Sequence, residues 1–438
     1  MTTALRTDRY ELTMVEAALR SGRAGRDCVF EVFGRRLPGE RRYGVLAGTG
    51  RVLDAITAFR FGQAELDWLA DERVVDDATL AFLADYRFTG QVEGYREGEV
   101  YVPGAPVLTV RGTFAEAVLL ETVVLSVLNY DSAVATAAAR MVAAADGHPI
   151  AEMGSRRANE SAAVAAARAA YIAGFSATSN LEAGRTWGIP TMGTAAHAFT
   201  LLHDSEEEAF RAQVAALGVG TTLLVDTYDV RQGVETAVRV AGTGLGGVRL
   251  DSGDLPALVR EVRAQLDALG ATGTRITVTS DLDEHTIAAL RGTPVDAFGV
   301  GTSVVTGSGS PAAGFVYKLV AHRYSDGEWM PVAKASTGKA SIGGAKRAER
   351  LLRDGVAVAE RIVVDDDRDG MPEAATPPDL TARALTVTLM TDGEPDALWL
   401  GPAGVAAARE HRAAAVAELP AAALRLSRGE PALPTISV

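Results

Sequence analysis

The sequence predicts an α/β protein with an irregular TIM-like α/β barrel, an N-terminal α+β domain and a C-terminal extension. From Pro149 onward, short apolar runs alternate with helical segments at the spacing of βα units, which indicates a parallel sheet. Polar motifs directly follow several of these runs, at the strand ends where an α/β barrel carries its active site. We expect the three parts at residues 1–145, 146–355 and 356–438, with the extension packed on the N-terminal domain.

Composition excludes several classes of protein. The chain has 438 residues, of which 47% are hydrophobic, and a net charge of −13. The length suits two domains or a barrel with additions. Nucleic-acid binding normally requires a basic surplus or a basic stripe, so we expect no nucleic-acid partner.

The cysteine count and the N-terminus favour a cytoplasmic protein. Cys28 is the single cysteine, which rules out an intramolecular disulfide and a thiolate-rich zinc site and fits a reducing compartment. Charged residues occur throughout Met1–Tyr10, so no apolar signal core is present there. The most apolar stretch, Ala115–Val127, is too short to span a bilayer, so we expect a buried helix and no membrane association.

The N-terminal domain is expected to begin with a helix and continue with short strands. Asp8 and Glu11 have the spacing of a capping box that opens a helix to about Leu19. A long helical region, Phe114–Ala145, closes the domain. The predicted strands before it are Cys28–Phe33, Tyr43–Ala47 and Val100–Val110, the last punctuated by prolines.

Six apolar runs are the predicted barrel strands. Ser205 with Glu208 forms a second capping box, and Asp283–Leu290 is a compact helix ended by Gly292. The tail has a lysine-rich segment, an acidic loop at Asp365–Asp369 and a helical region from Pro402. The predicted strands are Ile150–Met153, Ile189–Met192, Thr222–Val225, Gly247–Leu250, Ile276–Val278 and Val295–Val300.

Two adjacent arginines follow the first barrel strand, in the motif Glu152–Asn159. Asn159 can cap the alanine-rich helix that runs to Ile172. Arg156 and Arg157 beside a helix N-terminus, with its free N–H groups, favour a site for pyrophosphate or a carboxylate. The alternative is that both pair with surface carboxylates, but cations oppose the positive end of a helix dipole.

His197 ends the motif that follows the second strand, Gly193–His197. By itself it is more consistent with a satisfied core histidine than with a catalytic one. Asp226, after the next strand, could hydrogen-bond one imidazole nitrogen, fix the tautomer and raise the nucleophilicity of the other nitrogen. We assign no metal-ligating set, because no metal-ligand spacing links His197 to His148, His203, His285 or His322.

Acidic residues follow another strand, in Arg249–Asp254. Such residues can bind sugar hydroxyls or help to hold Mg²⁺. Ser252 or Asp254 could instead cap the next helix. One cap does not need two aspartates, so we favour a ligand role for Asp251.

Two later segments are candidates for binding phosphate. The glycine-rich Gly299–Ser303, with Gly307 and Gly309 beyond it, could close its N–H groups around a phosphate, although a bare glycine turn is common. The second segment contains Lys334, Lys339 and Lys346. Solvated lysines are the default interpretation there, and a contact to a nucleotide phosphate is the weaker one.

Taken together, these motifs resemble nicotinate phosphoribosyltransferase over nearly the whole chain. Each is a modest signal, and all of them occur in the family's order. They are Thr7–Met14, Phe30–Pro38, Glu152–Asn159, Thr178–Asn180, Gly193–His197, Arg249–Asp254 and Gly299–Ser303.

The resemblance implies that nicotinate displaces pyrophosphate from phosphoribosyl pyrophosphate, with ATP and Mg²⁺ as cofactors and ATP hydrolysis coupled through a phosphohistidine. It implies that His197 is phosphorylated and that Asp226 orients it. The remaining implied contacts are Arg156 and Arg157 to pyrophosphate or the substrate carboxylate, Asp251 to ribose, Gly301 and Thr302 to the 5-phosphate, and Thr178, Arg249 and Gly253 to substrate.

The resemblance also implies a homodimer, with Tyr10 stacking on the pyridine ring. Asn180 could donate to a carboxylate where the related nicotinamide enzyme has an aspartate, which favours the acid as substrate. In place of the Arg-Arg-Ala-Asn-Glu found here, many relatives have a glutamine followed by a small residue or aspartate. The alternatives are a nicotinamide or quinolinate phosphoribosyltransferase and a non-catalytic phosphate-binding barrel.

Overall fold

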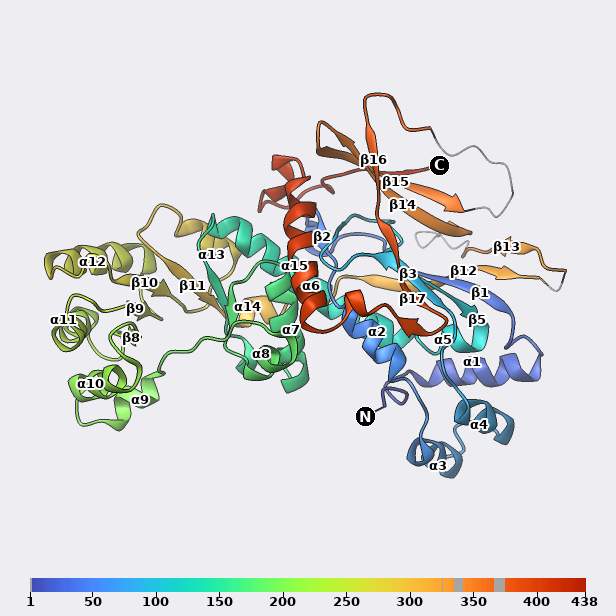
Figure 1. Ribbon diagram of the computed structural model, residues 1–438, viewed down its shortest axis with the longest axis horizontal. Helices are drawn as coiled ribbons and strands as arrows, with labels where there is room; N and C mark the ends of the chain where they lie inside the picture. Colours follow the sequence, from blue (N-terminus) through green and yellow to red (C-terminus); the bar gives the residue numbers. More distant parts are fainter. Residues whose placement is uncertain (1, 325, 335–341, 366–374) are drawn as a thin grey trace. The chain divides into compact units, whose positions relative to one another are not determined.

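A computed structural model of the chain describes residues 2–324, 326–334, 342–365 and 375–438. The chain divides into two units (Figure 1). Unit 1 consists of Met1–Thr136 and Ser310–Val438, and unit 2 of Ala137–Gly309. The division falls inside helix α6 (Glu121–Ala145), so both units contain part of this helix.

These units differ from the predicted domain boundaries at 145 and 355. The predicted barrel domain, 146–355, is too long at its C-terminal end, because residues 310–355 belong to unit 1 with residues 356–438. The physical reason is strand pairing. Strand β12 (Phe315–Arg323) pairs antiparallel with β1 (Asp27–Gly34), and β14 (Ala345–Arg353) pairs antiparallel with β15 (Val356–Asp365).

Unit 1 is organised around a seven-stranded sheet in the order β13-β12-β1-β5-β3-β17-β18. In β1, Phe30 faces the main core, where its ring stacks on Tyr317 of β12 with centroids 4.9 Å apart. The neighbouring Glu31 lies on the other face of the strand, as the period of two requires. The remaining strands of this sheet are β3 (Gln91–Tyr95), β5 (Leu108–Thr113), β13 (Trp329–Pro331), β17 (Thr386–Thr391) and β18 (Glu394–Pro395).

Glu31 and Lys346 form a buried ion pair in unit 1. The Nζ of Lys346 lies 2.7 Å from Glu31 Oε2, and both side chains are at most 7% exposed. Lys346 is therefore not the solvated lysine of the default interpretation. Lys339 and most of the acidic loop at Asp365–Asp369 lie outside the described residues.

Two smaller sheets and a set of helices complete unit 1. The four-stranded sheet has the order β16-β14-β15-β19, and β2 pairs with β4. The strands of these sheets not yet given are β2 (Gly44–Val45), β4 (Val100–Tyr101), β16 (Thr381–Ala384) and β19 (Thr435–Ser437). The α-helices are α1 (Arg9–Arg20), α2 (Thr49–Thr57), α3 (Gln63–Asp71), α4 (Asp77–Ala84), α5 (Phe114–Val118) and α15 (Gly401–Ala417).

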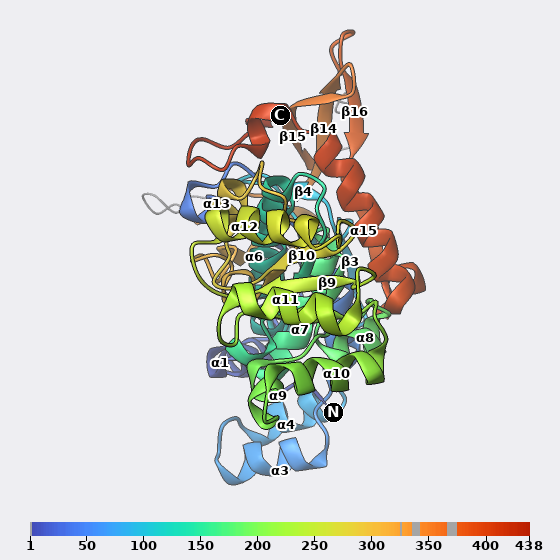
Figure 2. The same ribbon diagram turned by 90° about the vertical axis from the view of Figure 1, so that its left-hand side faces the viewer.

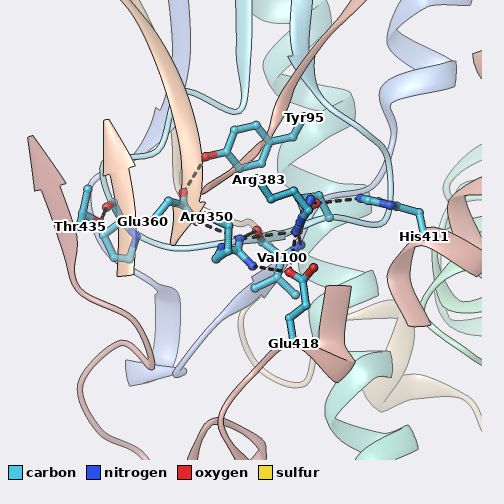
Figure 3. A network of polar contacts seen from close by, with 10 residues as sticks. Tyr95, Val100, Arg350, Glu360, Arg383, His411, Glu418 and Thr435 are labelled. Carbon is cyan, nitrogen blue, oxygen red and sulfur yellow. Dashed lines mark hydrogen bonds and ion pairs between the residues drawn. The ribbon is translucent and has the colours of Figure 1, made fainter. Parts of the chain in front are cut away.

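A buried polar network joins these sheets (Figure 3). Arg350 of β14 donates to Glu360 of β15 at 2.9 Å and to the Val100 carbonyl at 2.7 Å. The hydroxyl of Tyr95 on β3 donates to the other oxygen of Glu360 at 2.6 Å. Because buried charges need partners, these contacts are what allow Arg350 and Glu360 to be completely buried.

The helical region Phe114–Ala145 is long and apolar enough to cross a membrane by length and composition. In the structure, 61% of its most apolar window is buried inside the protein, as expected of a core helix. Residues such as Leu120, Val124 and Leu128 belong to the hydrophobic core of unit 1. The predicted buried helix is confirmed.

Unit 2 contains a six-stranded parallel sheet in the order β7-β6-β11-β10-β9-β8; Figure 2 labels its strands β9 and β10. Helices α10, α11 and α12 lie alongside this sheet in both views. The strands are β6 (Ile150–Glu152), β7 (Ala177–Thr178), β8 (Thr222–Leu224), β9 (Gly247–Leu250), β10 (Arg275–Val278) and β11 (Ala297–Val300). The α-helices are α7 (Glu160–Ile172), α8 (Leu181–Trp187), α9 (His197–Leu202), α10 (Glu206–Leu217), α11 (Val230–Ala241), α12 (Leu255–Ala268), α13 (Glu284–Ala289) and α14 (Thr302–Val305).

The strand order explains why the barrel is irregular. The predicted strand Ile189–Met192 is reduced to a single bridge, in which Thr191 pairs with Thr178 of β7. No hydrogen-bonded ladder between this segment and β8 is present among the described residues. The other five predicted barrel strands are confirmed, and β7 is an additional short strand.

Candidate active site

The carboxyl ends of β6, β9, β10 and β11 surround an open cavity in unit 2. It encloses about 560 Å³ of empty space, including the part open to solvent. Parallel strands bring residues far apart in the sequence to one edge, which is where ligands bind in such folds. The lining residues are Met153, Arg156, Arg157, Arg249, Asp251, Thr279, Ser280, Asp281, Gly299, Gly301 and Thr302.

Arg156 and Arg157 lie in this lining on a single 3-10 turn, Ser155–Arg157. Both are exposed, and neither guanidinium has a hydrogen-bond or ion-pair partner within the described part of the chain. Asn159 caps α7 as predicted, accepting from the backbone N–H groups of Ser161 and Ala162. The alternative of pairing with surface carboxylates is therefore not seen, and two free cations face the cavity.

Gly299 is required by close packing at the cavity wall. A Cβ on this residue would lie 2.6 Å from the Thr279 methyl and 2.7 Å from Met153 Sδ, well inside van der Waals contact. Gly301 and Thr302 follow it at the start of the short helix α14 and line the same cavity. A contact from these two residues to a phosphate remains a prediction.

Asp251 is held by two donors. Arg249 Nη2 donates to Asp251 Oδ1 at 3.1 Å, and the hydroxyl of Thr279 donates a short hydrogen bond to the same oxygen. Burial by itself would raise the pKa of Asp251, but these hydrogen bonds and the charge of Arg249 outweigh it and hold the pKa below its ordinary value. Asp251 is thus an ionised, partly exposed carboxylate in the cavity wall.

Arg249 also fixes the loop that leads to His197. Its Nη1 donates to Thr194 Oγ1 at 3.2 Å and to the Ala195 carbonyl at 3.4 Å. This guanidinium is 15% exposed and links the end of β9 to the loop before α9 from within the wall. A contact from Arg249 to substrate stays a prediction.

His197 is the first residue of α9, and its side chain is 41% exposed. Its Nδ1 lies 3.1 Å from the hydroxyl of Thr227. Its Nε2 lies 4.0 Å from Asp226 Oδ1 and 3.9 Å from Asp251 Oδ2. The two ring nitrogens therefore have different surroundings, a hydroxyl on one side and two carboxylates on the other.

The predicted hydrogen bond between His197 and Asp226 is wrong for this structure. The 4.0 Å separation is too long, and the other carboxylate oxygen of Asp226 already accepts from the Asp251 N–H at 2.8 Å and the Ser252 hydroxyl at 2.9 Å. Asp226 Oδ1 is buried and has no hydrogen-bond partner within the described residues. The nearest candidate partner is the His197 imidazole. With a proton on Nε2, a small movement of the ring would bring it into hydrogen-bond distance of Asp226 Oδ1.

Thr178 and Asn180 support the loops near the cavity. Thr178 is buried, and its hydroxyl donates to Glu152 at 2.6 Å. Asn180 caps α8 through its side-chain oxygen Oδ1, which accepts from the Ala183 N–H, and its Nδ2 donates to the Ser155 hydroxyl at 2.9 Å. Neither lines the cavity in this structure, so their predicted substrate contacts remain predictions.

The other predicted residues are not gathered into this wall. Gly253 has φ of +95°, which favours glycine in the turn before α12. Asp254 stands at the cap position of α12, but its side chain makes no capping hydrogen bond. Tyr10 lies on α1 of unit 1 and is 45% exposed.

Three residues of the cavity wall and the hydroxyl partner of His197 were not predicted from the sequence. Thr279, Ser280 and Asp281 follow β10 directly and line the cavity. Thr227 follows β8, two residues beyond Val225. The rule that identified the other motifs, polar residues directly after a parallel strand, would have found all four. Ser280 also has φ of +101°, a strained value that a sequence does not reveal.

The arrangement is suited to polyanionic ligands. Free cations line one part of the cavity, and an ionised carboxylate lies beside a partly exposed histidine. Within the described residues there is no group of three or more His, Cys, Asp or Glu side chains able to hold a metal ion.

Comparisons with known proteins cover nearly the whole chain. Residues 5–129 match the family model for the nicotinate phosphoribosyltransferase N-terminal domain, and residues 134–308 match the model for the quinolinate phosphoribosyl transferase C-terminal domain. A nicotinate phosphoribosyltransferase of Mycobacterium tuberculosis strain H37Rv is 55% identical over 99% of this chain and 95% of its own length. The corresponding Bacillus subtilis protein is 39% identical over 80% of this chain and 73% of its own length.

Solved structures agree with the fold. The human nicotinic acid phosphoribosyltransferase has a TM-score of 0.81 and 26% identity, covering 99% of this chain and 97% of the human chain. The nicotinate-nucleotide pyrophosphorylase of Pyrococcus furiosus has a TM-score of 0.77 and 24% identity over 97% of this chain and 96% of its own. The second likeness supports the fold alone.

Proposed function

The chain belongs to the nicotinate phosphoribosyltransferase family and has that activity, and we propose that ATP promotes the transfer by phosphorylating His197. In the transfer, nicotinate displaces pyrophosphate from phosphoribosyl pyrophosphate and forms nicotinate mononucleotide. The observation that carries the proposal is the asymmetric setting of His197, with a hydroxyl at Nδ1 and two carboxylates near Nε2. An orienting partner for one nitrogen is what a nucleophilic imidazole requires.

The same asymmetry favours Nδ1 as the nucleophile. Asp226 and Asp251 near Nε2 stabilise a proton there and repel an incoming phosphoryl group. With the proton on Nε2, Nδ1 carries the lone pair and accepts from the Thr227 hydroxyl. As Nδ1 bonds to the γ-phosphorus of ATP, the bond to ADP breaks, and the two carboxylates compensate the positive charge that develops on the ring.

The chemistry of the transfer assigns roles to the cavity wall. Positive charge develops on the ribose carbon while pyrophosphate departs with the bonding electrons, so the site must stabilise a highly charged leaving group. Arg156 and Arg157, free and exposed, would bind pyrophosphate or the nicotinate carboxylate. Asp251 would bind the ribose hydroxyls, and the backbone at Gly301 and Thr302 the 5-phosphate.

We include Mg²⁺ as a partner of the polyphosphate substrates. Asp281 fits it, since this exposed carboxylate lines the cavity and has no partner among the residues described. Mg²⁺ usually takes one or two protein carboxylates together with phosphate oxygens and waters. When bound, it would neutralise charge on the departing pyrophosphate.

A cytoplasmic homodimer completes the proposal. Tyr10, 45% exposed on α1, would stack on the pyridine ring of nicotinate across the dimer interface. Chromatography with light scattering tests the dimer. Mixing a Tyr10→Ala protein with a His197→Ala protein should then restore activity if the two residues serve one site from different subunits.

The coupling is tested by measuring nicotinate mononucleotide formed from nicotinate, phosphoribosyl pyrophosphate and Mg²⁺, with and without ATP. We expect ATP to raise the product strongly in the wild type and not in His197→Ala. Equal product without ATP would keep the transferase activity and discard the phosphohistidine. Labelling with γ-³²P-ATP, followed by acid and alkali treatment, should show the acid-labile, alkali-stable phosphate of a phosphoramidate bond.

A further inference from the structure

Thr279 stands between the two charged groups of the site. It directly follows β10, it is 3% exposed, and its backbone N–H donates to the Leu250 carbonyl of β9 at 2.9 Å. Its hydroxyl accepts from Arg249 Nε at 2.9 Å and donates to Asp251 Oδ1. The backbone contact fixes Thr279 relative to the strand that carries both partners.

The direction of these hydrogen bonds follows from the proton count. A threonine hydroxyl has one proton, and Arg249 can act only as a donor. The hydroxyl must therefore use a lone pair for Arg249 and its proton for an acceptor. Of the two acceptors in reach, the carboxylate of Asp251 is much closer than the Leu250 carbonyl at 3.4 Å, and it is charged.

The consequence is a fixed orientation of the Asp251 carboxylate. Oδ1 accepts from both Thr279 and Arg249, so rotation of the carboxylate would break two hydrogen bonds. Oδ2 is left as the oxygen that lies 3.9 Å from His197 Nε2. Without the hydroxyl, Arg249 alone would hold Asp251, and its Nη2 contact at 3.1 Å does not define the rotation of the carboxylate.

We propose that Thr279 is a positioning residue of the transfer reaction: its hydroxyl holds the Asp251 carboxylate turned so that one oxygen faces His197 and substrate. Thr279 acts through Asp251. The inference rests on the role of Asp251 in the proposed function and extends it to a residue outside the family motifs quoted above.

Other charged groups near Asp251 must be considered in a pH measurement. Arg249 lies on its own strand, His197 approaches from α9, and the carboxylate of Asp226 accepts its backbone N–H. Asp281, Arg156 and Arg157 line the same cavity. These residues are the same in every Thr279 variant, so a difference between the Val and Ser variants reports the hydroxyl, whose loss removes the acceptor of Arg249 Nε together with the donor to Asp251.

The test compares Thr279→Val, which keeps the shape and loses the hydroxyl, with Thr279→Ser, which keeps the hydroxyl. Thr274→Val is the matched control. Thr274 precedes the same strand, at the end opposite to the cavity, is 1% exposed, and donates to the Leu245 carbonyl at 2.9 Å. The measurement is the rate of nicotinate mononucleotide formation at saturating ATP and nicotinate, with phosphoribosyl pyrophosphate and pH varied.

We expect kcat/KM for phosphoribosyl pyrophosphate to fall about 10- to 100-fold in Thr279→Val, the range for removing a group that orients a ligating side chain. The acidic limb of the pH profile should move to higher pH, since Asp251 loses a donor that favours its ionised form. Thr279→Ser should restore both properties to within about threefold, and Thr274→Val should leave both unchanged.

Three results would overturn the inference: a wild-type profile in Thr279→Val, equal defects in the Val and Ser variants, or the same defect in Thr274→Val. Thermal unfolding checks the fold, and Thr279→Ala replaces the Val variant if valine prevents folding. Asp251→Asn distinguishes a failure of the proposed role of Asp251 from a failure of the proposed role of Thr279. If it retains full activity, the role of Asp251 fails, whereas a defect there with a normal Thr279→Val removes the inference alone.

Discussion

At the scale of single residues, the buried carboxylate of Glu152 connects two loops near the cavity. Glu152, at the end of β6, accepts from the Gly154 N–H and from the Thr178 hydroxyl, and its own carbonyl accepts from the Ser179 N–H at 2.9 Å. Burial raises the pKa of Glu152 above its ordinary value, although both hydrogen bonds oppose the shift. Glu152 thereby joins the loop that carries the two arginines to the loop that carries Asn180.

Asn180→Asp tests substrate selection at this position. Aspartate can still cap α8 by accepting from the Ala183 N–H, so the fold should be retained. The added negative charge should disfavour the nicotinate carboxylate, and we expect kcat/KM for nicotinate to fall about tenfold or more, with less effect on nicotinamide. Steady-state rates with both substrates measure the ratio.

The matched control is Asn159→Asp, the same substitution at the exposed cap of α7, where Asn159 accepts from two backbone N–H groups. It should preserve the ratio of the two substrates. An unchanged ratio in Asn180→Asp would show that Asn180 does not select the acid.

Residue-scale prediction succeeded where position along a strand was sufficient. Arg156, Arg157 and Asp251 could be assigned to one cavity because parallel strands end at the same edge. The pairing of His197 with Asp226 could not, because a backbone N–H and a hydroxyl compete for that carboxylate and only coordinates reveal them. The role of Thr279 also depends on hydrogen-bond geometry between two strands.

At the scale of elements, the close packing of β11 against its neighbours shapes the cavity wall. Gly299 faces the Thr279 methyl and Met153 Sδ, and no room exists for a Cβ. Gly299→Ala should force these strand ends apart and lower the free energy of unfolding by about 1–3 kcal/mol, the usual cost of overpacking. It should also reduce activity, since Thr279 holds Asp251.

Chemical denaturation and initial rates measure the two effects of Gly299→Ala. Gly273→Ala is the control, because a Cβ there meets nothing within 4 Å and the residue lies in the turn before β10. Wild-type stability and activity in Gly299→Ala would contradict this prediction, because the neighbouring Thr279 and Met153 would then accommodate a Cβ without loss of unfolding free energy.

Elements were predictable where one face or both faces of a strand are apolar. The run Cys28–Phe33 became β1, and five apolar runs became barrel strands. The predicted capping box of α1 is wrong, because Glu11 is buried and accepts from Thr7 and Thr122, while Asp8 makes no side-chain cap. A tertiary contact that spans more than a hundred residues overrides the local pattern there.

At the scale of the whole molecule, the return of the chain from unit 2 to unit 1 at residue 310 was not predicted from the sequence. The sequence alone shows no boundary between the barrel and residues 310–355, which the structure assigns to unit 1. Their partners, such as β1 for β12, lie near the other end of the sequence. Long-range strand pairing of this kind decides which unit a segment joins.

Unit 1 also contains a network of charged residues whose contribution to the stability of the protein depends on pH (Figure 3). Glu99, 1% exposed, accepts from Arg383 at 2.9 Å and lies 2.8 Å from His411 Nε2. Burial alone would raise the pKa of Glu99, but the contacts with His411, Arg383 and Arg350 outweigh it and lower the pKa to about 2 from 4.5. Because the folded-state pKa is depressed, the stabilisation is fully present above pH 4.5 and is lost as pH falls toward 2.

Glu99→Gln removes this titration, so the difference in unfolding free energy between wild type and variant isolates it. Urea denaturation from about pH 5 to about pH 3, below the range in which histidines titrate, should show the difference shrinking by about 2 kcal/mol. Glu360→Gln provides the contrast. Burial raises the pKa of Glu360 in spite of Arg350, so its wild-type-minus-variant difference should grow as pH falls. Parallel slopes for the two variants would mean that the network titrates as one group and that neither assignment holds.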